Sequence, residues 1–184
     1  MRIVGGVASG RRLVAPPGNN TRPTGERVRE ALFNSLAWVI PGARVLDLYA
    51  GSGAMGLEAI SWGARWVLMV EPDHRARTAI HTNITSLAMA DKTTVWPMAA
   101  EAALPQLIEA DPFDVVICDP PWDNGLSSKV VQALPQIVSA KGWVIVEHRR
   151  SDPSPKFSHL EWVKTRQYGD TALSWWSRPV EGED

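Results

Sequence analysis

The sequence has little cysteine, no long apolar run and almost no net charge, and each shortage excludes a class of protein. Its one cysteine, Cys118, excludes a disulfide scaffold and a cysteine-rich zinc site and suits a reducing cytoplasm. The four histidines show no metal-ligand spacing, so we expect no metal. Because the chain has no run of 18 apolar residues and no signal sequence, we expect a cytoplasmic protein without a membrane partner.

The formal net charge of −1 argues against a nucleic-acid partner only as an average over the whole chain. Residues 1–30 contain six arginines and two glutamates, a balance of +4. The remaining residues contain 13 basic and 18 acidic side chains. The average therefore hides a basic N-terminal arm on an acidic body.

From residue 43 onward, short apolar runs alternate with helical patterns, which predicts an α/β fold. Short connections of this kind imply right-handed crossovers and a mostly parallel sheet. The expected strands are 44–49, 66–70, 93–98, 113–118 and 143–147, and the expected helices are 54–62, 73–87, 100–109 and 126–139.

The two ends of the chain differ from this pattern. Residues 160–168 and 171–177 predict two strands around Gly169, which would form an antiparallel hairpin at the edge of a seven-stranded sheet. Residues 2–6 and 11–14 predict a small hairpin, and residues 27–39 predict an amphipathic helix. We therefore divide the chain into an N-terminal extension, 1–40, and a main domain, 41–184.

The segment from Gly51 to Gly56 reads G-x-G-x-x-G, directly after a predicted strand and at the start of a predicted helix. Glycines permit a tight turn there, and the free N–H groups of a helix N-terminus favour a negative ligand group. Glu71 ends the next strand, where a carboxylate can accept hydrogen bonds from ribose hydroxyls. The pattern predicts a nucleotide-type cofactor site formed by Gly51, Ser52, Gly53 and Glu71.

Asp47 distinguishes between two kinds of cofactor. It lies four residues before Gly51, where a carboxylate would repel a pyrophosphate but attract the ammonium group of S-adenosylmethionine. The same carboxylate could instead accept hydrogen bonds from N–H groups of the glycine loop, and the two roles are compatible.

The fourth predicted strand ends in Asp119-Pro120-Pro121-Trp122. Ligands of doubly wound sheets bind beyond the carboxyl ends of such strands. Asp119 and the Pro120 carbonyl provide two acceptors, which suit an exocyclic amine with its two N–H groups, and Trp122 provides a flat face for a base. Acceptors placed in this way would direct the amine lone pair toward a methyl donor.

Together these residues resemble the class I S-adenosylmethionine-dependent amino methyltransferases, which have a Rossmann-like fold. The N-terminal residues Met1–Gly6, Ser9–Leu13 and Arg22–Asn34 resemble the RsmD family of bacterial 16S rRNA guanine-N2 methyltransferases more specifically. Residues 47–59 and 168–173 fit this family too, and the resemblance covers residues 2–178.

The resemblance implies methyl transfer from S-adenosylmethionine to the N2 amine of one guanine in 16S rRNA of the small subunit. It assigns the flipped guanine to Asp119, Pro120, Pro121 and Trp122. It also assigns RNA contacts to the arginines of the arm: Arg2, Arg11, Arg12, Arg22, Arg27 and Arg29. Met98 and Ala99 correspond to the adenine-binding position, where the family usually has Asp or Asn before Ala, so backbone and packing would replace that side chain.

Two other functions stay open at this point, and we expect a monomer in each case. A DNA adenine-N6 or cytosine-N4 methyltransferase would use the same Asp-Pro-Pro-aromatic motif, but 184 residues leave no room for a separate target-recognition domain. A non-catalytic RNA-binding ribosome assembly factor is the third possibility, and the intact Asp119 argues against it.

Overall fold

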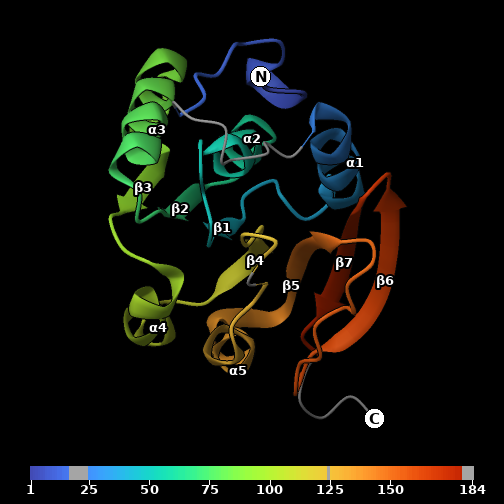
Figure 1. Ribbon diagram of the computed structural model, residues 1–184. Helices are drawn as coiled ribbons and strands as arrows, with labels where there is room; N and C mark the ends of the chain where they lie inside the picture. The colour runs from blue at the N-terminus through green and yellow to red at the C-terminus, as the bar shows by residue number, and fades with distance from the viewer. Residues whose placement is uncertain (17–24, 124, 180–184) are drawn as a thin grey trace.

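A computed structural model describes residues 1–16, 25–123 and 125–179. Within these residues the chain forms one seven-stranded sheet with helices on both faces (Figure 1). The strands are β1 (Arg44–Asp47), β2 (Trp66–Val70), β3 (Thr93–Trp96), β4 (Phe113–Cys118), β5 (Val138–Arg149), β6 (Glu161–Tyr168) and β7 (Thr171–Ser177). The helices are η1 (Gly6–Ala8), α1 (Glu26–Leu36), α2 (Ala54–Ser61), α3 (His74–Leu87), η2 (Ala90–Lys92), α4 (Ala100–Glu109) and α5 (Ser128–Ile137).

The strand order is β3-β2-β1-β4-β5-β7-β6. The first five strands of the chain pair in parallel, and β7 pairs antiparallel with both β5 and β6. The order reverses between β1 and β4, which creates the switch point where such sheets bind ligands. The predicted Rossmann-like sheet with an antiparallel C-terminal hairpin is therefore confirmed.

Successive residues of the central strands enter two different apolar clusters, as the alternation of a strand requires. Val45 and Val67 belong to the cluster that includes α1, α2 and α3. Leu46 and Leu68 belong to the cluster on the opposite face, with α4 and α5. Figure 1 shows these two helical layers with the sheet between them. The strands are continuously apolar because both faces are covered.

Two predicted boundaries near the fifth strand are wrong. The helix predicted over 126–139 ends at Ile137, and β5 extends from Val138 rather than from Trp143. The buried Val138 has an extended backbone and pairs with the buried Phe113 of β4. This tertiary pairing decides its conformation, and local helix periodicity does not register it.

The N-terminal segments pair as predicted, but over a short distance. Arg2 and Arg12 form an isolated antiparallel bridge, and Ile3 N–H donates to the Arg11 carbonyl at 2.9 Å. The predicted helix over 27–39 is also shorter, because α1 ends at Leu36.

The N-terminal extension packs into the main body. Ile3 and Leu13 are buried in the same cluster as Val45 and Val67. The two parts thus share one apolar core, and the division at residue 40 stays a prediction from sequence. Of the helices in the described ranges, none is long and apolar enough to cross a membrane.

Candidate active site

A cavity of about 550 Å³ opens at the carboxyl ends of β1, β2 and β4. This volume falls within the roughly 300–1,000 Å³ typical of small-molecule and cofactor sites. The cavity brings together most of the predicted site residues: Gly51, Ser52, Glu71, Ala99, Asp119, Pro120, Pro121 and Trp122. It lies at the switch point, where the topology of the sheet predicts a ligand.

Three predicted cofactor residues do not line this cavity: Asp47, Gly53 and Met98. Gly53 is buried with φ of +77°, and a Cβ there would lie 3.1 Å from Ile80, so it shapes the turn. Met98 packs against the apolar cluster beneath α4 and α5. A direct contact of these three residues with a cofactor stays a prediction.

Glu71 connects the end of β2 to the glycine loop. Its Oε2 accepts from the Gly51 N–H and its Oε1 from the Asp73 N–H, each at 2.8 Å. Burial raises the pKa of the Glu71 carboxyl above its usual value, although these two hydrogen bonds oppose the shift. Each carboxylate oxygen has a second lone pair, so Glu71 can accept hydroxyl donors while it holds the loop.

Asp47 lies behind the glycine loop and is only 1% exposed. Its Oδ2 accepts from the Gly56 N–H at 2.9 Å, whereas its Oδ1 is buried and has no hydrogen-bond partner within the described residues. Burial raises the pKa of this carboxyl to about 7, with a further contribution from the charge of Asp119. Gly56 allows the close approach of helix and sheet, since a Cβ there would lie 2.8 Å from Met69. Asp47 therefore connects the end of β1 to the first turn of α2, directly after the glycine loop.

The Asp119–Trp122 segment forms the opposite side of the cavity. The guanidinium carbon of Arg149 lies 5.5 Å from the centre of the Trp122 ring, a distance typical of a cation–π contact. The same guanidinium donates to Asp123 Oδ1 at 2.8 Å. Arg149 thus links the end of β5 to the segment that follows β4.

Several side chains in or next to the cavity wall were assigned no role from the sequence. Glu147, 5% exposed, and Tyr49 both line it. The signal for Glu147 was available, because it ends the fifth predicted strand as Glu71 ends the second. Asn83 of α3 was also missed: its Oδ1 accepts from Val14 N–H at 2.7 Å, and its Nδ2 donates to the Ser52 carbonyl at 3.2 Å. It connects the basic arm to the glycine loop.

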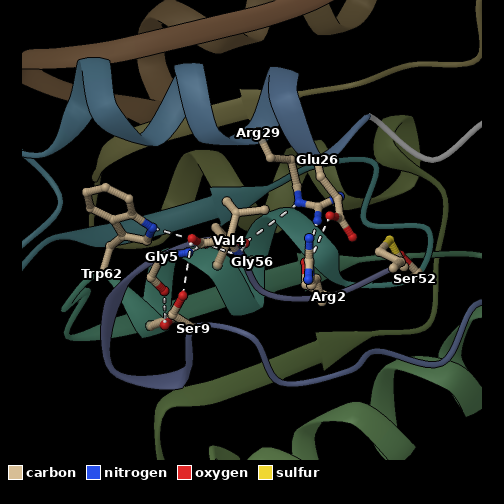
Figure 2. Close-up of polar contacts among 12 residues, drawn as sticks. Arg2, Val4, Gly5, Ser9, Glu26, Arg29, Ser52, Gly56 and Trp62 are labelled. Atoms are coloured by element: carbon tan, nitrogen blue, oxygen red, sulfur yellow. Dashed lines mark hydrogen bonds and ion pairs between the residues drawn. The ribbon is translucent and has the colours of Figure 1, made fainter.

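Four of the six predicted RNA-binding arginines are exposed: Arg2, Arg11, Arg12 and Arg27. Arg2 Nε donates to Glu26 Oε2 at 3.0 Å (Figure 2). Arg11 donates to the Ser86 carbonyl of α3. Arg22 lies outside the described residues.

The prediction that Arg29 binds RNA is wrong. Its side chain is fully buried, and its Nε lies 3.7 Å from Oε2 of the equally buried Glu58. It also donates from Nη2 to the Arg2 carbonyl at 2.6 Å (Figure 2). Glu58 accepts in addition from the Val4 and Gly5 N–H groups. Since a buried carboxylate requires a cation and hydrogen-bond donors, Arg29 serves to hold the arm on α2.

The fold and the cavity define a Rossmann-like α/β protein with a ligand site at its switch point. The family model described as "Conserved hypothetical protein 95" matches residues 1–177, and the chain belongs to this family. The resemblance to the RsmD family is thereby confirmed.

Three relatives show the extent of the similarity. "Ribosomal RNA small subunit methyltransferase D" of Escherichia coli strain K12 is 38% identical over 147 residues, 80% of this chain and 71% of that protein. YlbH of Bacillus subtilis is 30% identical over 178 residues, 95% of this chain and 97% of that protein. The solved structure of Escherichia coli yhhF has a TM-score of 0.85 at 32% identity and covers 98% of this chain and 99% of that chain.

Proposed function

We propose that this protein transfers a methyl group from S-adenosylmethionine to the exocyclic N2 amine of a guanine in 16S rRNA of the small ribosomal subunit. The observation that carries the proposal is that the glycine loop, Glu71 and Asp119–Trp122 all line the same cavity. Membership of the family and the name of the Escherichia coli relative support the substrate class.

The residues of the cavity suit a nucleoside-type methyl donor. Glu71 accepts hydrogen bonds from ribose hydroxyls, while Gly51 and Ser52 bring the backbone close to the donor's amino-acid end. Asp47 lies behind this loop and contributes negative potential toward the ammonium group. Ala99 forms part of the wall on the adenine side. When bound, S-adenosylmethionine supplies an electrophilic methyl group on a positively charged sulfur.

The Asp119–Trp122 segment positions the amine. A guanine N2 is a weak nucleophile because its lone pair is delocalised into the ring. Asp119 and the Pro120 carbonyl accept the two N–H groups and thereby direct the lone pair toward the methyl carbon, and Trp122 stacks on the base. Such positioning lowers barriers by up to about 7–11 kcal/mol. After transfer the amine releases one proton, for which no strong base is required.

The exposed arginines of the arm, Arg2, Arg11, Arg12 and Arg27, contact RNA phosphates in this proposal. Arg22 has the same role by its place in the sequence. The enzyme acts as a monomer in the cytoplasm, where it meets the small subunit.

Labelled methyl transfer tests the proposal. Purified protein is incubated with methyl-labelled S-adenosylmethionine and small subunits from a strain that lacks the enzyme, with large subunits and double-stranded DNA as parallel substrates. We expect label in 16S rRNA of the small subunit only. Label in DNA would favour a DNA amine methyltransferase, and no label in any substrate would favour a binding protein.

A further inference from the structure

A second, smaller cavity of about 210 Å³ adjoins the first one. The two cavities share Pro120, Trp122, Glu147 and Arg149. The remaining wall of the small cavity combines apolar and proline residues with two polar side chains, His148 and Asp152. Its small volume suits one planar ring system rather than a whole nucleoside cofactor.

The far wall of the small cavity is fixed to the sheet. It contains Asp152, Pro153 and Pro155, in the segment between β5 and β6. Asp152 N–H donates to the Arg149 carbonyl at 3.0 Å. Ser154 Oγ lies 3.1 Å from Ser174 Oγ on β7. These hydrogen bonds hold the wall in place beside the ends of β4 and β5.

Glu147 and Asp119 occupy matching positions on neighbouring parallel strands. Cys118 of β4 pairs with Val146 of β5, and each acidic residue directly follows one member of this pair. Figure 1 shows β4 and β5 side by side. Since paired strands lie about 4.7–4.9 Å apart, the two residues are neighbours in the sheet. Asp119 lines the large cavity, and Glu147 lines both cavities where they meet.

Carboxylates at this junction favour one kind of base. An ionised carboxylate only accepts hydrogen bonds. The Watson–Crick edge of guanine presents adjacent N1–H and N2–H donors, whereas adenine and cytosine present an unprotonated ring nitrogen at the corresponding place. Enzymes that act on an extruded base read this edge. A buried carboxylate beside the ring nitrogen next to the amine therefore matches guanine and repels the other two bases.

We propose that the small cavity takes the target base and that Glu147 selects guanine by accepting from its N1–H group. This inference rests on the proposed function and adds a specificity-determining residue to it. Trp122 lines both cavities and stacks on the base, and Arg149 holds Trp122 and Asp123 in place through the contacts described above.

A substrate with 2-aminopurine in place of the target guanine tests the inference. This base retains the C2 amine but has an unprotonated N1, which accepts a hydrogen bond. The methylated nucleotide is first mapped, and reassembled small subunits then carry either base at that position. The kcat/KM for each base is measured with wild type, Glu147→Gln, and the exposed control Glu161→Gln.

We expect wild type and Glu161→Gln to favour guanine by about 100-fold or more, because a site built for hydrogen-bond donors rejects a base that lacks one. Glu147→Gln provides an amide N–H for the unprotonated N1 of 2-aminopurine. The ratio should therefore fall at least tenfold in this variant, while its Kd for S-adenosylhomocysteine stays within about threefold of wild type.

Equal losses on both bases, an unchanged ratio, or a collapse of cofactor binding in Glu147→Gln would overturn the role of Glu147 while the proposed function stands. A wild-type enzyme that methylates neither substrate would overturn the proposed function itself, and the role of Glu147 with it.

Discussion

Arg29 and Glu58 form an ion pair in which both side chains are fully buried, with 3.7 Å between Nε and Oε2. The pair lies between α1 and α2 and contacts the backbone of residues 2–5 at the start of the N-terminal arm. Glu58 also accepts from Trp62 Nε1 at 3.0 Å and from the N–H groups of Val4 and Gly5. The arm of the protein is therefore anchored by charge on the helix that follows the glycine loop.

Arg29→Ala should destabilise the protein strongly, since it leaves the Glu58 carboxylate buried without its cation. Loss of one partner of a buried pair costs about 3–5 kcal/mol. Arg27→Ala, an exposed change on the same helix, should alter the free energy of unfolding by no more than about 0.5 kcal/mol. Urea unfolding of the two variants measures both values. Similar stabilities for the two would contradict the anchoring role of Arg29.

Much of the fold and of the site could be predicted from the sequence, because local patterns determine them. Apolar runs predicted β2 and β4 with their observed bounds. The glycine motif and Glu71 predicted two sides of the cavity, and the contact between Gly51 and Glu71 joins them.

The remainder depends on contacts between distant segments. The family resemblance assigned Arg29 to RNA with the other arginines of the arm, but its partner Glu58 is 29 residues away in the sequence. A local sign of burial was that Leu32 and Phe33 follow Arg29 by three and four residues, which places all three on the same, buried face of α1. The early start of β5 depends on the pairing of Val138 with Phe113, which no local pattern records.

Asp47 should make stability fall as the pH rises. Its folded pKa is about 7 against an ordinary value of 3.8, so between these values the folded state binds more protons than the unfolded state. The slope of stability with pH is then negative. The loss begins above about pH 4, is complete above about pH 7, and amounts to roughly 4 kcal/mol at most, from about 1.4 kcal/mol per pKa unit.

Asp47→Asn tests this dependence, because the amide keeps an acceptor for Gly56 and carries no charge. The difference in unfolding free energy between Asp47→Asn and wild type, measured in urea at pH 4 and pH 7.5, should shift in favour of the variant at the higher pH. A difference that does not change with pH would show that Asp47 ionises normally in the folded protein.

Glu71→Gln should weaken cofactor binding. The amide retains one acceptor oxygen but loses the charge and the second acceptor. Hydrogen bonds to charged groups contribute about 1.5–3 kcal/mol, so the Kd for S-adenosylhomocysteine should rise about 10- to 100-fold. Isothermal titration calorimetry measures it, with the exposed Glu109→Gln as control. An unchanged Kd in Glu71→Gln would remove Glu71 from the cofactor site.

Replacement of Arg11 and Arg12 by alanine should weaken RNA binding and reduce its salt dependence. Each lost phosphate contact lowers the slope of log K against log salt by about 0.7–0.9. Cofactor affinity should stay nearly unchanged, because neither side chain lines the cavity. Filter binding at several salt concentrations measures the slope, and Arg65→Ala, exposed outside the arm, is the control. A parallel loss of cofactor affinity would instead show that these arginines support the cavity.

The most direct test of the account is nucleoside mass spectrometry of 16S rRNA after reaction with wild type and with Asp119→Ala. We predict that wild type adds one N2-methylguanosine per small subunit. Asp119→Ala should react at least about 100-fold more slowly, because the amine is no longer positioned. It should bind S-adenosylhomocysteine with nearly wild-type affinity. Equal methylation by the two proteins, or a methyl group on another atom or base, would contradict the central claim.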